Sequence, residues 1–521
     1  MGKERRAIEQ SLSLLVKSSI IVFLGVAFSK IVTYLYRIYI FRFFGPEEYG
    51  LFSLSLSIIS IVVTLSALGF SEGIIRYISI YRKNKNFKKI KAIYLWSIFL
   101  SGILSVLAGL LVLVFAPSIA NGFFHNDKLV LYLRIFSICV PFLVIGNLWL
   151  SLLRSFERIG AYSFLVNVVQ NGSKLAALII FSLIGLRATA VPFSFLLGTM
   201  LIFVLSYSYS KRFVRLIVSS GTKSRKIERE GLSSYLHYCW PIIFLTVVNS
   251  LFMWADSFVI GYYMDVSSVG YYSVAFSIVA LFGIGADIFM QLFFPLIARE
   301  YGQGNRKLTE ETSKQVTKWI FIINLPLFIL IVLFPGAIIN LLFGKESLIA
   351  VAPLRILAIG GFFSSILVLQ TTLLSIKGKS RLILFNLLST TLLNTILNII
   401  LVPRFGLLGA ASATSFIWIL LTVVVAFQVR NYFSFIPLRR KLIRIFAAAG
   451  IASVVLFWLK QYIPITLVSM ILLSFFFGIF YLLLVFLLRG MDSYDLQIMN
   501  NMKKKLISFV RRAPSKKEET N

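Results

Sequence analysis

The sequence has little charge and few of the residues that build catalytic or metal sites. Only 14% of its 521 residues are charged, and it has two cysteines and two histidines. Cys139 and Cys239 both lie in apolar stretches, and His125 and His237 are far apart. These four residues cannot form a disulfide framework or a zinc site. We therefore expect no metal site.

A nucleotide-binding loop and a catalytic domain are also missing. Gly378-Lys379-Ser380 resembles the end of a phosphate-binding loop, but Leu373 stands where the first glycine would be needed. The largest polar segment, near 211–235, is too short for a catalytic domain. The sequence therefore predicts neither ATP hydrolysis nor an enzyme.

Hydrophobic residues make up 58% of the chain, and the mean hydropathy is +0.89. Soluble domains are about 45–50% apolar and about 25% charged, so a soluble globule is excluded. A membrane-spanning helix takes about 20 apolar residues, or roughly 35 to 40 with its loop. The pattern of apolar runs predicts an all-α polytopic membrane protein with 14 transmembrane helices.

The positive charges alternate between the loops. Of the 52 lysines and arginines, 41 fall in every second loop or in the two termini. Cytoplasmic loops collect lysine and arginine, so we expect a multi-pass protein of the plasma (cytoplasmic) membrane with both termini cytoplasmic. This distribution explains most of the +32 net charge through contacts with membrane lipids. Nucleic acid binding is not expected.

The chain repeats itself at an offset of about 220 residues. FGPEEYGLFSLSLSI (44–58) aligns with MDVSSVGYYSVAFSI (264–278), and IGLRATA (184–190) aligns with FGLLGAA (405–411). The repeat predicts two pseudo-symmetric six-helix lobes plus a C-terminal helix pair. The expected parts are a cytoplasmic N-terminus (1–17), an N-lobe (18–210), a basic cytoplasmic linker (211–235), a C-lobe (236–430), transmembrane helices 13 and 14 (431–489) and a cytoplasmic tail (490–521).

Polar residues recur at helical spacing inside two spans of the first half. Lys30 and Arg37 share one helix face, as do Asn167, Asn171 and Lys174. Ionisable residues within a span usually face a cavity or a partner. We interpret these five as candidate ligands for an anionic phosphate headgroup, since arginine and lysine both bind phosphate.

The second half carries carboxylates and amides instead: Asp256, Asp287, Gln291, Asn394 and Asn398. The two carboxylates are candidate sites for a coupling proton or Na⁺. The alternative is structural, in which Asp256 pairs across the lobes with a cation of the first half. No other cofactor is expected.

Several strings resemble a known family. They are GPEEYGLFSLSLSI, ADSFVIGYY (255–263), FFPLIAREYGQGNRKL (293–308) and, most specifically, the stretch 342–414. They are similar to the polysaccharide-transporter and O-antigen flippase (Wzx-like) branch of the MATE-like multidrug/oligosaccharidyl-lipid/polysaccharide (MOP) exporter superfamily. This resemblance implies a V-shaped pair of lobes that alternate access, and a flippase for sugars linked to a polyprenyl carrier.

We therefore expect a flippase that moves polyprenyl-(pyro)phosphate-linked oligosaccharide from the cytoplasmic to the outer leaflet, for cell-surface polysaccharide or glycan biosynthesis. Two alternatives remain: a cation-coupled multidrug antiporter of the MATE type, and a membrane component of an envelope-polymer assembly complex. The expected partners are the lipid-linked glycan, membrane lipids and a glycan polymerase or glycosyltransferases. We expect the protein to be monomeric.

Overall fold

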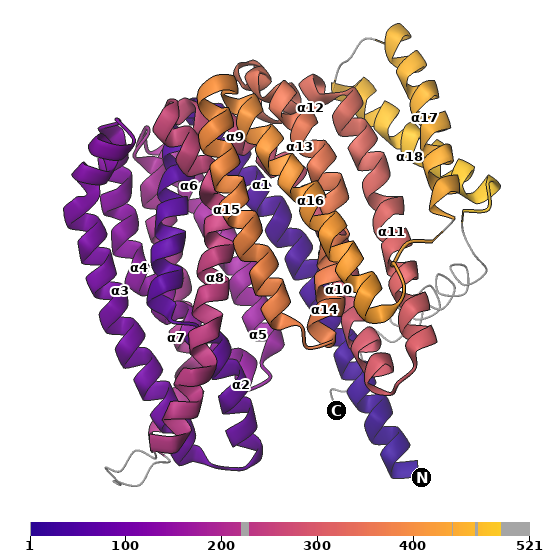
Figure 1. Ribbon diagram of the computed structural model, residues 1–521. Helices are drawn as coiled ribbons and strands as arrows, with labels where there is room; N and C mark the ends of the chain where they lie inside the picture. Colours follow the sequence, from indigo (N-terminus) through magenta and orange to yellow (C-terminus); the bar gives the residue numbers. More distant parts are fainter. Residues whose placement is uncertain (1, 220–228, 440, 464–466, 491–521) are drawn as a thin grey trace, which may run out of the picture.

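The computed structural model describes residues 2–219, 229–439, 441–463 and 467–490, and helices make up nearly all of them (Figure 1). The predicted tail (490–521) lies outside the described residues from 491 onward, as do residues 220–228 of the predicted linker. No strand occurs in the described ranges.

The elements are α1 (Gly2–Ala67), α2 (Phe70–Lys83), α3 (Phe87–Phe123), α4 (Lys128–Ser155), α5 (Ile159–Ser163), the π-helix η1 (Phe164–Val169), α6 (Gln170–Leu183), α7 (Ala190–Ser219), α8 (Arg229–Tyr263), α9 (Val266–Val279), α10 (Leu281–Gly302), α11 (Arg306–Leu333), α12 (Pro335–Phe343), the 3₁₀ helix η2 (Lys345–Ala350), α13 (Val351–Ser364), α14 (Leu367–Ile376), α15 (Ser380–Phe405), α16 (Leu407–Phe433), α17 (Leu442–Tyr462) and α18 (Leu467–Leu487).

Thirteen helical segments of the described chain are long and apolar enough to cross a membrane. The first, Gly25–Lys83, has 59 residues, or about 88 Å at the helical rise, against a hydrocarbon core of about 30 Å. It bends at Gly45 (φ 91°, ψ 176°), a conformation open essentially to glycine alone. Figure 1 shows the two indigo arms of α1 on either side of this kink. The expected number of 14 spans stays a prediction.

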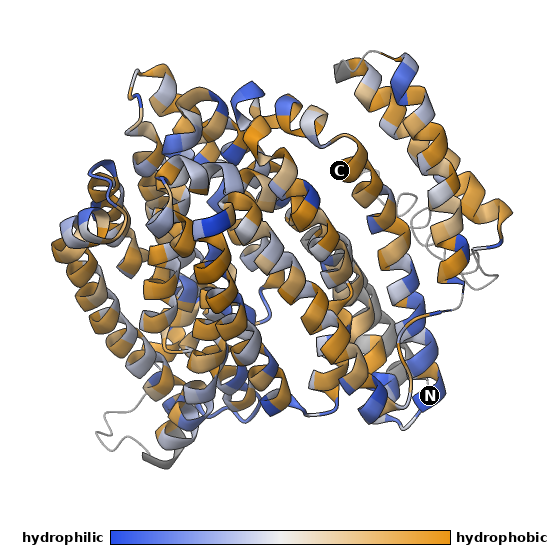
Figure 2. Cartoon of the chain, turned by 45° about the horizontal axis from the view of Figure 1, so that its top comes forward, coloured by the Kyte–Doolittle hydropathy of each residue, from blue (hydrophilic) through white to orange (hydrophobic). Residues whose placement is uncertain are grey.

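Hydrophobic residues predominate along the helices, and hydrophilic residues are more frequent at the helix ends and in the connections (Figure 2). On α3, Leu110, Leu111, Val114 and Phe115 are each more than half exposed. Soluble proteins rarely expose such contiguous apolar surface. The protein is therefore a multi-pass helical membrane protein.

The two halves of the chain use the same helix pairs. We call α1–α7 the N-half and α8–α16 the C-half. In the N-half α7 packs against α4 and α6, and in the C-half α16 packs against α13 and α15. These are the pairs that the 220-residue offset relates. Helices α17 and α18 pack against each other and against α11, outside the repeat. The exact division into two lobes stays a prediction.

The halves meet where α1 crosses α9. A Cβ atom on Gly50 would lie 1.9 Å from the carbonyl oxygen of Val266, and one on Gly270 would lie 2.2 Å from that of Pro46. Gly50 and Gly270 are related by the repeat, as are Pro46 and Val266. The crossing is thus a pseudo-symmetric backbone contact that admits no side chain at either glycine.

This crossing lies at one end of the bundle, which we call the far end. The far end is formed by the connections 44–48, 124–127, 184–189, 263–266, 343–347 and 405–407. The opposite end, the basic end, is formed by the connections 84–86, 156–158, 303–305, 377–379 and 434–441. The start of α1 and helix α2 lie at the basic end, which is lower in Figure 1.

Candidate functional site

The first arm of α1 places a polar face against the C-half, and we call this contact the seam. The Tyr34 hydroxyl donates to the Ser277 carbonyl oxygen of α9. The buried Tyr49 hydroxyl lies beside both Ser277 and Arg37. Arg37 is half-buried and forms no ion pair with any carboxylate in the part of the chain that the structure describes. Its guanidinium therefore enters the seam without a neutralising partner.

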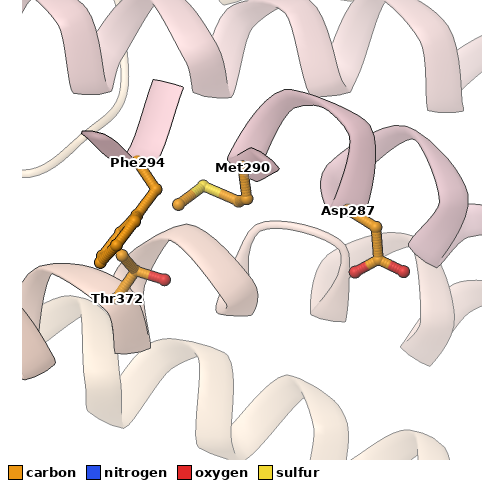
Figure 3. Close-up of a pocket in the computed structure, with 4 residues that line it drawn as sticks. All are labelled: Asp287, Met290, Phe294 and Thr372. Atoms are coloured by element: carbon orange, nitrogen blue, oxygen red, sulfur yellow. The ribbon is translucent and has the colours of Figure 1, made fainter. Parts of the chain in front are cut away.

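Lys30 lies on the same face of α1, toward the basic end, and interacts electrostatically with Asp287 of α10. The two do not form an ion pair. Asp287 is exposed and lines a cavity of about 310 Å³ with Met290, Phe294 and Thr372. Figure 3 shows Phe294 beside Thr372 of α14, Met290 reaching toward Phe294, and Asp287 further along α10. Asp287 thus lies beside the cavity and within electrostatic range of Lys30.

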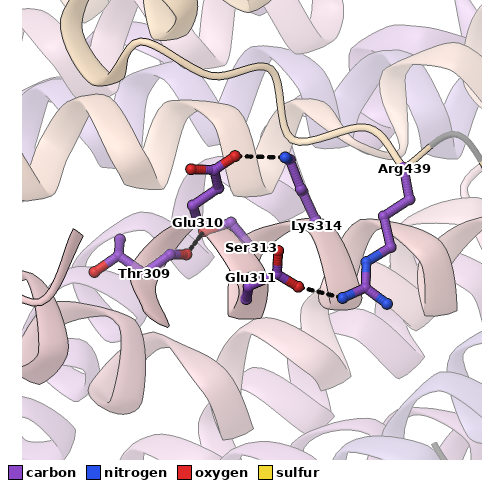
Figure 4. A network of polar contacts seen from close by, with 6 residues as sticks. All are labelled: Thr309, Glu310, Glu311, Ser313, Lys314 and Arg439. Carbon is purple, nitrogen blue, oxygen red and sulfur yellow. Dashed lines mark hydrogen bonds and ion pairs between the residues drawn. The ribbon is translucent and has the colours of Figure 1, made fainter. Parts of the chain in front are cut away.

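Charged side chains at the start of α11, away from the seam, form direct ion pairs. At the start of α11, Lys314 pairs with Glu310 at 2.5 Å, and Arg439 pairs with Glu311 (Figure 4). The second pair joins the connection 434–441 to α11. Such ion pairs near the surface contribute about 0–1 kcal/mol each. Their direct contact contrasts with the separated charges of Lys30 and Asp287.

The two amides expected in the headgroup site are engaged within the N-half. The Asn171 amide donates to the Ser29 hydroxyl of α1 at 2.9 Å, and the Asn167 amide donates to the Ser163 hydroxyl at 3.0 Å. Gly25 lies against the same surface, where its Cβ would be 2.9 Å from the Ser163 Oγ. Asn171 thus ties α6 to α1 and has both amide hydrogens in use, since it also donates to the Val166 carbonyl oxygen, whereas the Asn167 bond stays within its own helix.

Lys174 does not join Lys30 and Arg37 at the seam. Its ammonium lies 4.1 Å from the centre of the Phe195 ring, and its stem packs against Gly198, where a Cβ would lie 2.4 Å from the Lys174 Cγ. Both contacts are on α7. The physical reason is that Gly198 of α7 has no side chain and leaves room for the Lys174 stem. The expected shared face therefore splits, with Asn171 toward α1 and Lys174 toward α7.

Asp256 is buried in the C-half and is surrounded by four donors. Tyr272 and Thr414 donate hydroxyl hydrogens to Oδ2, at 2.5 and 2.6 Å. The amides of Asn394 and Asn398 donate to Oδ1, at 3.1 and 2.8 Å. All five residues belong to the C-half, so Asp256 forms no inter-lobe ion pair with Lys30 or Arg37. That part of the structural alternative is wrong, because the carboxylate is satisfied within its own half.

The same cluster holds two buried acceptors without partners, the Oδ1 atoms of Asn394 and Asn398. Buried polar atoms are almost always hydrogen-bonded. If each side-chain amide rotated by 180°, its oxygen would face the Asp256 carboxylate. The oxygens would then repel one another unless a cation lay between them. Oxygen ligands of this kind suit a hard cation. Turning both amides over would therefore replace the hydrogen-bonded carboxylate by a set of oxygens suited to a cation.

Gln291, the remaining candidate, has its side chain outside the described residues. No group of three or more histidine, cysteine or acidic residues suited to a metal occurs in the described part of the chain.

Sequence reasoning missed four residues that contribute to these sites. Tyr272 and Thr414 contact Asp256, Tyr49 lies beside Arg37, and Ser277 contacts Tyr34 and Tyr49. Each comes from a helix distant in sequence or across a turn. Hydroxyl residues are frequent in these spans, so the sequence offered no signal to choose these four.

This geometry is that of a polytopic membrane protein built from two similar helical halves, with ionisable groups at their contact and a buried carboxylate in one half. Such repeats, related by an axis along the membrane normal, are typical of transporters.

The comparisons with known proteins identify the family. The family model described as "Polysaccharide biosynthesis protein" matches residues 15–301, and the MatE model matches residues 241–400. The "Probable low-salt glycan biosynthesis flippase Agl15" of Haloferax volcanii is 24% identical over 89% of this chain and 94% of its own length. The chain belongs to the polysaccharide biosynthesis protein family, within the MOP superfamily, which confirms the resemblance seen in the sequence.

Solved structures share the fold. The lipid II flippase MurJ, in an inward closed conformation, aligns with a TM-score of 0.67 at 15% identity, over 89% of this chain and 98% of that one. An inward-facing multidrug resistance MATE family transporter aligns with a TM-score of 0.63 at 16% identity, over 80% of this chain and 98% of that one. The expected all-α MATE-like fold is confirmed.

Proposed function

We propose that this protein is a flippase that carries a polyprenyl-(pyro)phosphate-linked oligosaccharide from the cytoplasmic to the outer leaflet. The observation that carries the proposal is the pair Lys30 and Arg37 on the α1 face at the seam, neither in an ion pair with a described carboxylate. Family membership and the names of Agl15, a glycan biosynthesis flippase, and MurJ, a lipid II flippase, support it. The protein acts as a carrier and not as an enzyme.

The two cations suit a phosphate headgroup in different ways. Arg37 offers a planar guanidinium for a bidentate grip, and Lys30 offers a compact point charge. In the absence of substrate the nearby Asp287 offsets the charge of Lys30. An entering phosphate competes with that carboxylate for the ammonium. The polyprenyl tail stays in lipid, so no bare charge crosses hydrocarbon.

The orientation follows from the charges. The basic end faces the cytoplasm and the far end faces outward, in the plasma membrane, because cytoplasmic loops collect lysine and arginine. The closed crossing of Gly50 and Gly270 then seals the outer side. In this state substrate reaches the seam from the cytoplasm.

A cation bound at Asp256 couples to this movement. The support is the buried carboxylate together with the unpartnered Oδ1 atoms of Asn394 and Asn398. A proton would need one oxygen, whereas Na⁺ takes several, so the spare oxygens favour Na⁺. Asp287, which faces the cavity, responds to the headgroup instead.

The rival function is a MATE-type multidrug antiporter, whose fold is also similar. Its cationic drugs would meet Lys30 and Arg37 at the seam, where like charges repel. An anionic headgroup is favoured there. The protein functions as a monomer that receives its lipid-linked glycan from glycosyltransferases and passes it to a polymerase.

Complementation of a strain that lacks its own flippase tests this proposal. We expect Lys30→Ala and Arg37→Ala each to lower outward movement of a labelled lipid-linked sugar by about tenfold or more, since a charge-assisted contact contributes about 1.5–3 kcal/mol. Lys174→Met is the matched control, because Lys174 contacts Phe195 away from the seam. Equal transport by wild type and all three variants, at equal protein levels, would remove the headgroup site.

A further inference from the structure

A second cavity, of about 410 Å³, opens at the far end of the N-half. Its size falls in the roughly 300–1,000 Å³ range of small-molecule sites. It lies between the kink of α1 and the α6–α7 connection, and its lining includes Phe43, Phe44, Glu48, Ser182, Gly185 and Arg187. None of these residues takes part in the seam or in the Asp256 cluster.

Two charged groups in this cavity have unused binding capacity. Glu48 is 9% exposed, and its Oε2 accepts from the Tyr132 hydroxyl at 2.5 Å. Its Oε1 accepts no hydrogen bond from the described part of the protein. Arg187 is exposed and makes no ion pair within the described residues. Glu47, the neighbour of Glu48, is by contrast paired with Lys128 at 2.9 Å.

An aromatic ring stands at the mouth of the cavity. Phe43 is 66% exposed, and Tyr39 stacks on it at 4.2 Å between ring centres. The Tyr39 hydroxyl donates to the Ser182 hydroxyl at 3.1 Å, which fixes the stack against α6. The Phe43 ring is therefore fixed in place and presents an exposed apolar face beside the Glu48 carboxylate and the Arg187 guanidinium.

The internal repeat shows that the fold does not need this chemistry. Gly185 and Gly406 are equivalent and both have positive φ, 89° and 56°. In the C-half Ser268 replaces Glu48 and Leu408 replaces Arg187. There Met264, the equivalent of Phe44, fills the space, with its Cε 3.3 Å from where a Cβ of Gly406 would lie. A Cβ on Gly185 would meet nothing within 4 Å.

We propose that this cavity is a binding site for the sugar of the lipid-linked glycan as it leaves on the outer side. The apolar face of a pyranose ring packs on Phe43, and its hydroxyls donate to the free oxygen of Glu48. Arg187 binds the acidic group next to the ring, a phosphate or a uronate carboxylate. This inference rests on the proposed flippase function and adds a subsite that holds the head after it has crossed the seam.

The test uses the full-length protein in phosphatidylcholine nanodiscs and glucose 1-phosphate as a soluble probe. Saturation-transfer NMR measures contact with the ring C–H protons, with methyl glucoside and inorganic phosphate as separate probes. Phe43→Ala, Glu48→Gln and Arg187→Gln are compared with equivalent changes in the C-half, Tyr263→Ala, Ser268→Ala and Leu408→Ala. In Glu48→Gln the side-chain oxygen can still accept the hydrogen bond from the Tyr132 hydroxyl, so we expect the fold to be retained.

We expect transfer to the sugar ring in wild type and in the three C-half controls. Binding should be about tenfold weaker in Glu48→Gln and Arg187→Gln, as for loss of one charge-assisted contact, and weaker in Phe43→Ala, which loses the apolar face. Equal transfer in all proteins, or complete competition by inorganic phosphate with no signal from methyl glucoside, would overturn the sugar site. The probe needs no transport. If the wild type flips its substrate but does not bind the probe, only the subsite is refuted. Failure of the wild type to flip refutes the proposed function.

Discussion

Replacing Gly270 by valine is expected to hold the far end open and to stop transport. Its Cβ would lie 2.2 Å from the Pro46 carbonyl oxygen, a contact that real Cβ atoms essentially never make. Both partners are backbone, so α1 and α9 must separate. Overpacking of this kind costs about 1–3 kcal/mol, which is roughly a five- to 150-fold shift in a conformational equilibrium. Gly50→Val acts in the same way, through Val266.

Spin labels at the far end measure this shift. Asp127→Cys and Lys345→Cys place labels on exposed residues of the two halves, after Cys139→Ala and Cys239→Ala remove the native thiols. We expect a longer distance to dominate in Gly270→Val. Gly122→Val, where a Cβ meets nothing within 4 Å, should keep the wild-type distance. An unchanged distance in Gly270→Val would show that the crossing is not a gate.

Replacing Asp256 is expected to abolish the response of the protein to sodium. Asp256→Asn removes the charge, and a neutral amide cannot hold Na⁺ among the oxygens of Asn394, Asn398 and Thr414. Asp256→Ala additionally removes the acceptor that four buried donors share. We expect it to lower the free energy of unfolding by about 3–5 kcal/mol, as for a broken buried polar cluster.

Thermal unfolding in detergent, in sodium chloride and in choline chloride of equal ionic strength, separates these effects. Saturating Na⁺ should stabilise the wild type by about 2.7 kcal/mol at a hundred times its dissociation constant, and should leave Asp256→Asn unchanged. Asp287→Asn serves as the control, because Asp287 lies outside the cluster and faces the cavity. A sodium response that persists in Asp256→Asn would place the ion elsewhere.

Long-range patterns in the sequence predicted the fold well. Apolar runs, alternating basic loops and the 220-residue repeat each involve many residues, so local exceptions such as the kink at Gly45 do not disturb them. The repeat also related Gly50 to Gly270 before their contact was known. The sequence did not predict that the backbones touch there, since that depends on how two distant helices cross.

The sites were predicted less evenly. Spacings of three, four and seven residues keep Lys30, Tyr34 and Arg37 within about 60° on α1, and the seam contains all three. Asn167, Asn171 and Lys174 have the same spacing, yet α7 takes up the Lys174 side chain. Helical spacing defines a face, but the neighbouring helix decides what the face contacts.

The chemistry of the two halves differs although their helix pairs match. The N-half supplies Lys30 and Arg37 to the seam, and the C-half supplies Asp287 there and keeps Asp256 in its own interior. A headgroup and a coupling cation would thus bind at separate places. Movement of the two halves past each other at the crossing of Gly50 and Gly270 would couple binding at one place to binding at the other.

Reconstituted flipping tests the central claim most directly. The protein would be placed in liposomes with a fluorescent polyprenyl-pyrophosphate sugar, and the fraction reaching the opposite leaflet would be measured over time. We predict rapid movement for wild type and movement at the protein-free rate for the double variant Lys30→Gln, Arg37→Gln. Wild-type rates in the double variant would mean that these cations do not meet the phosphate.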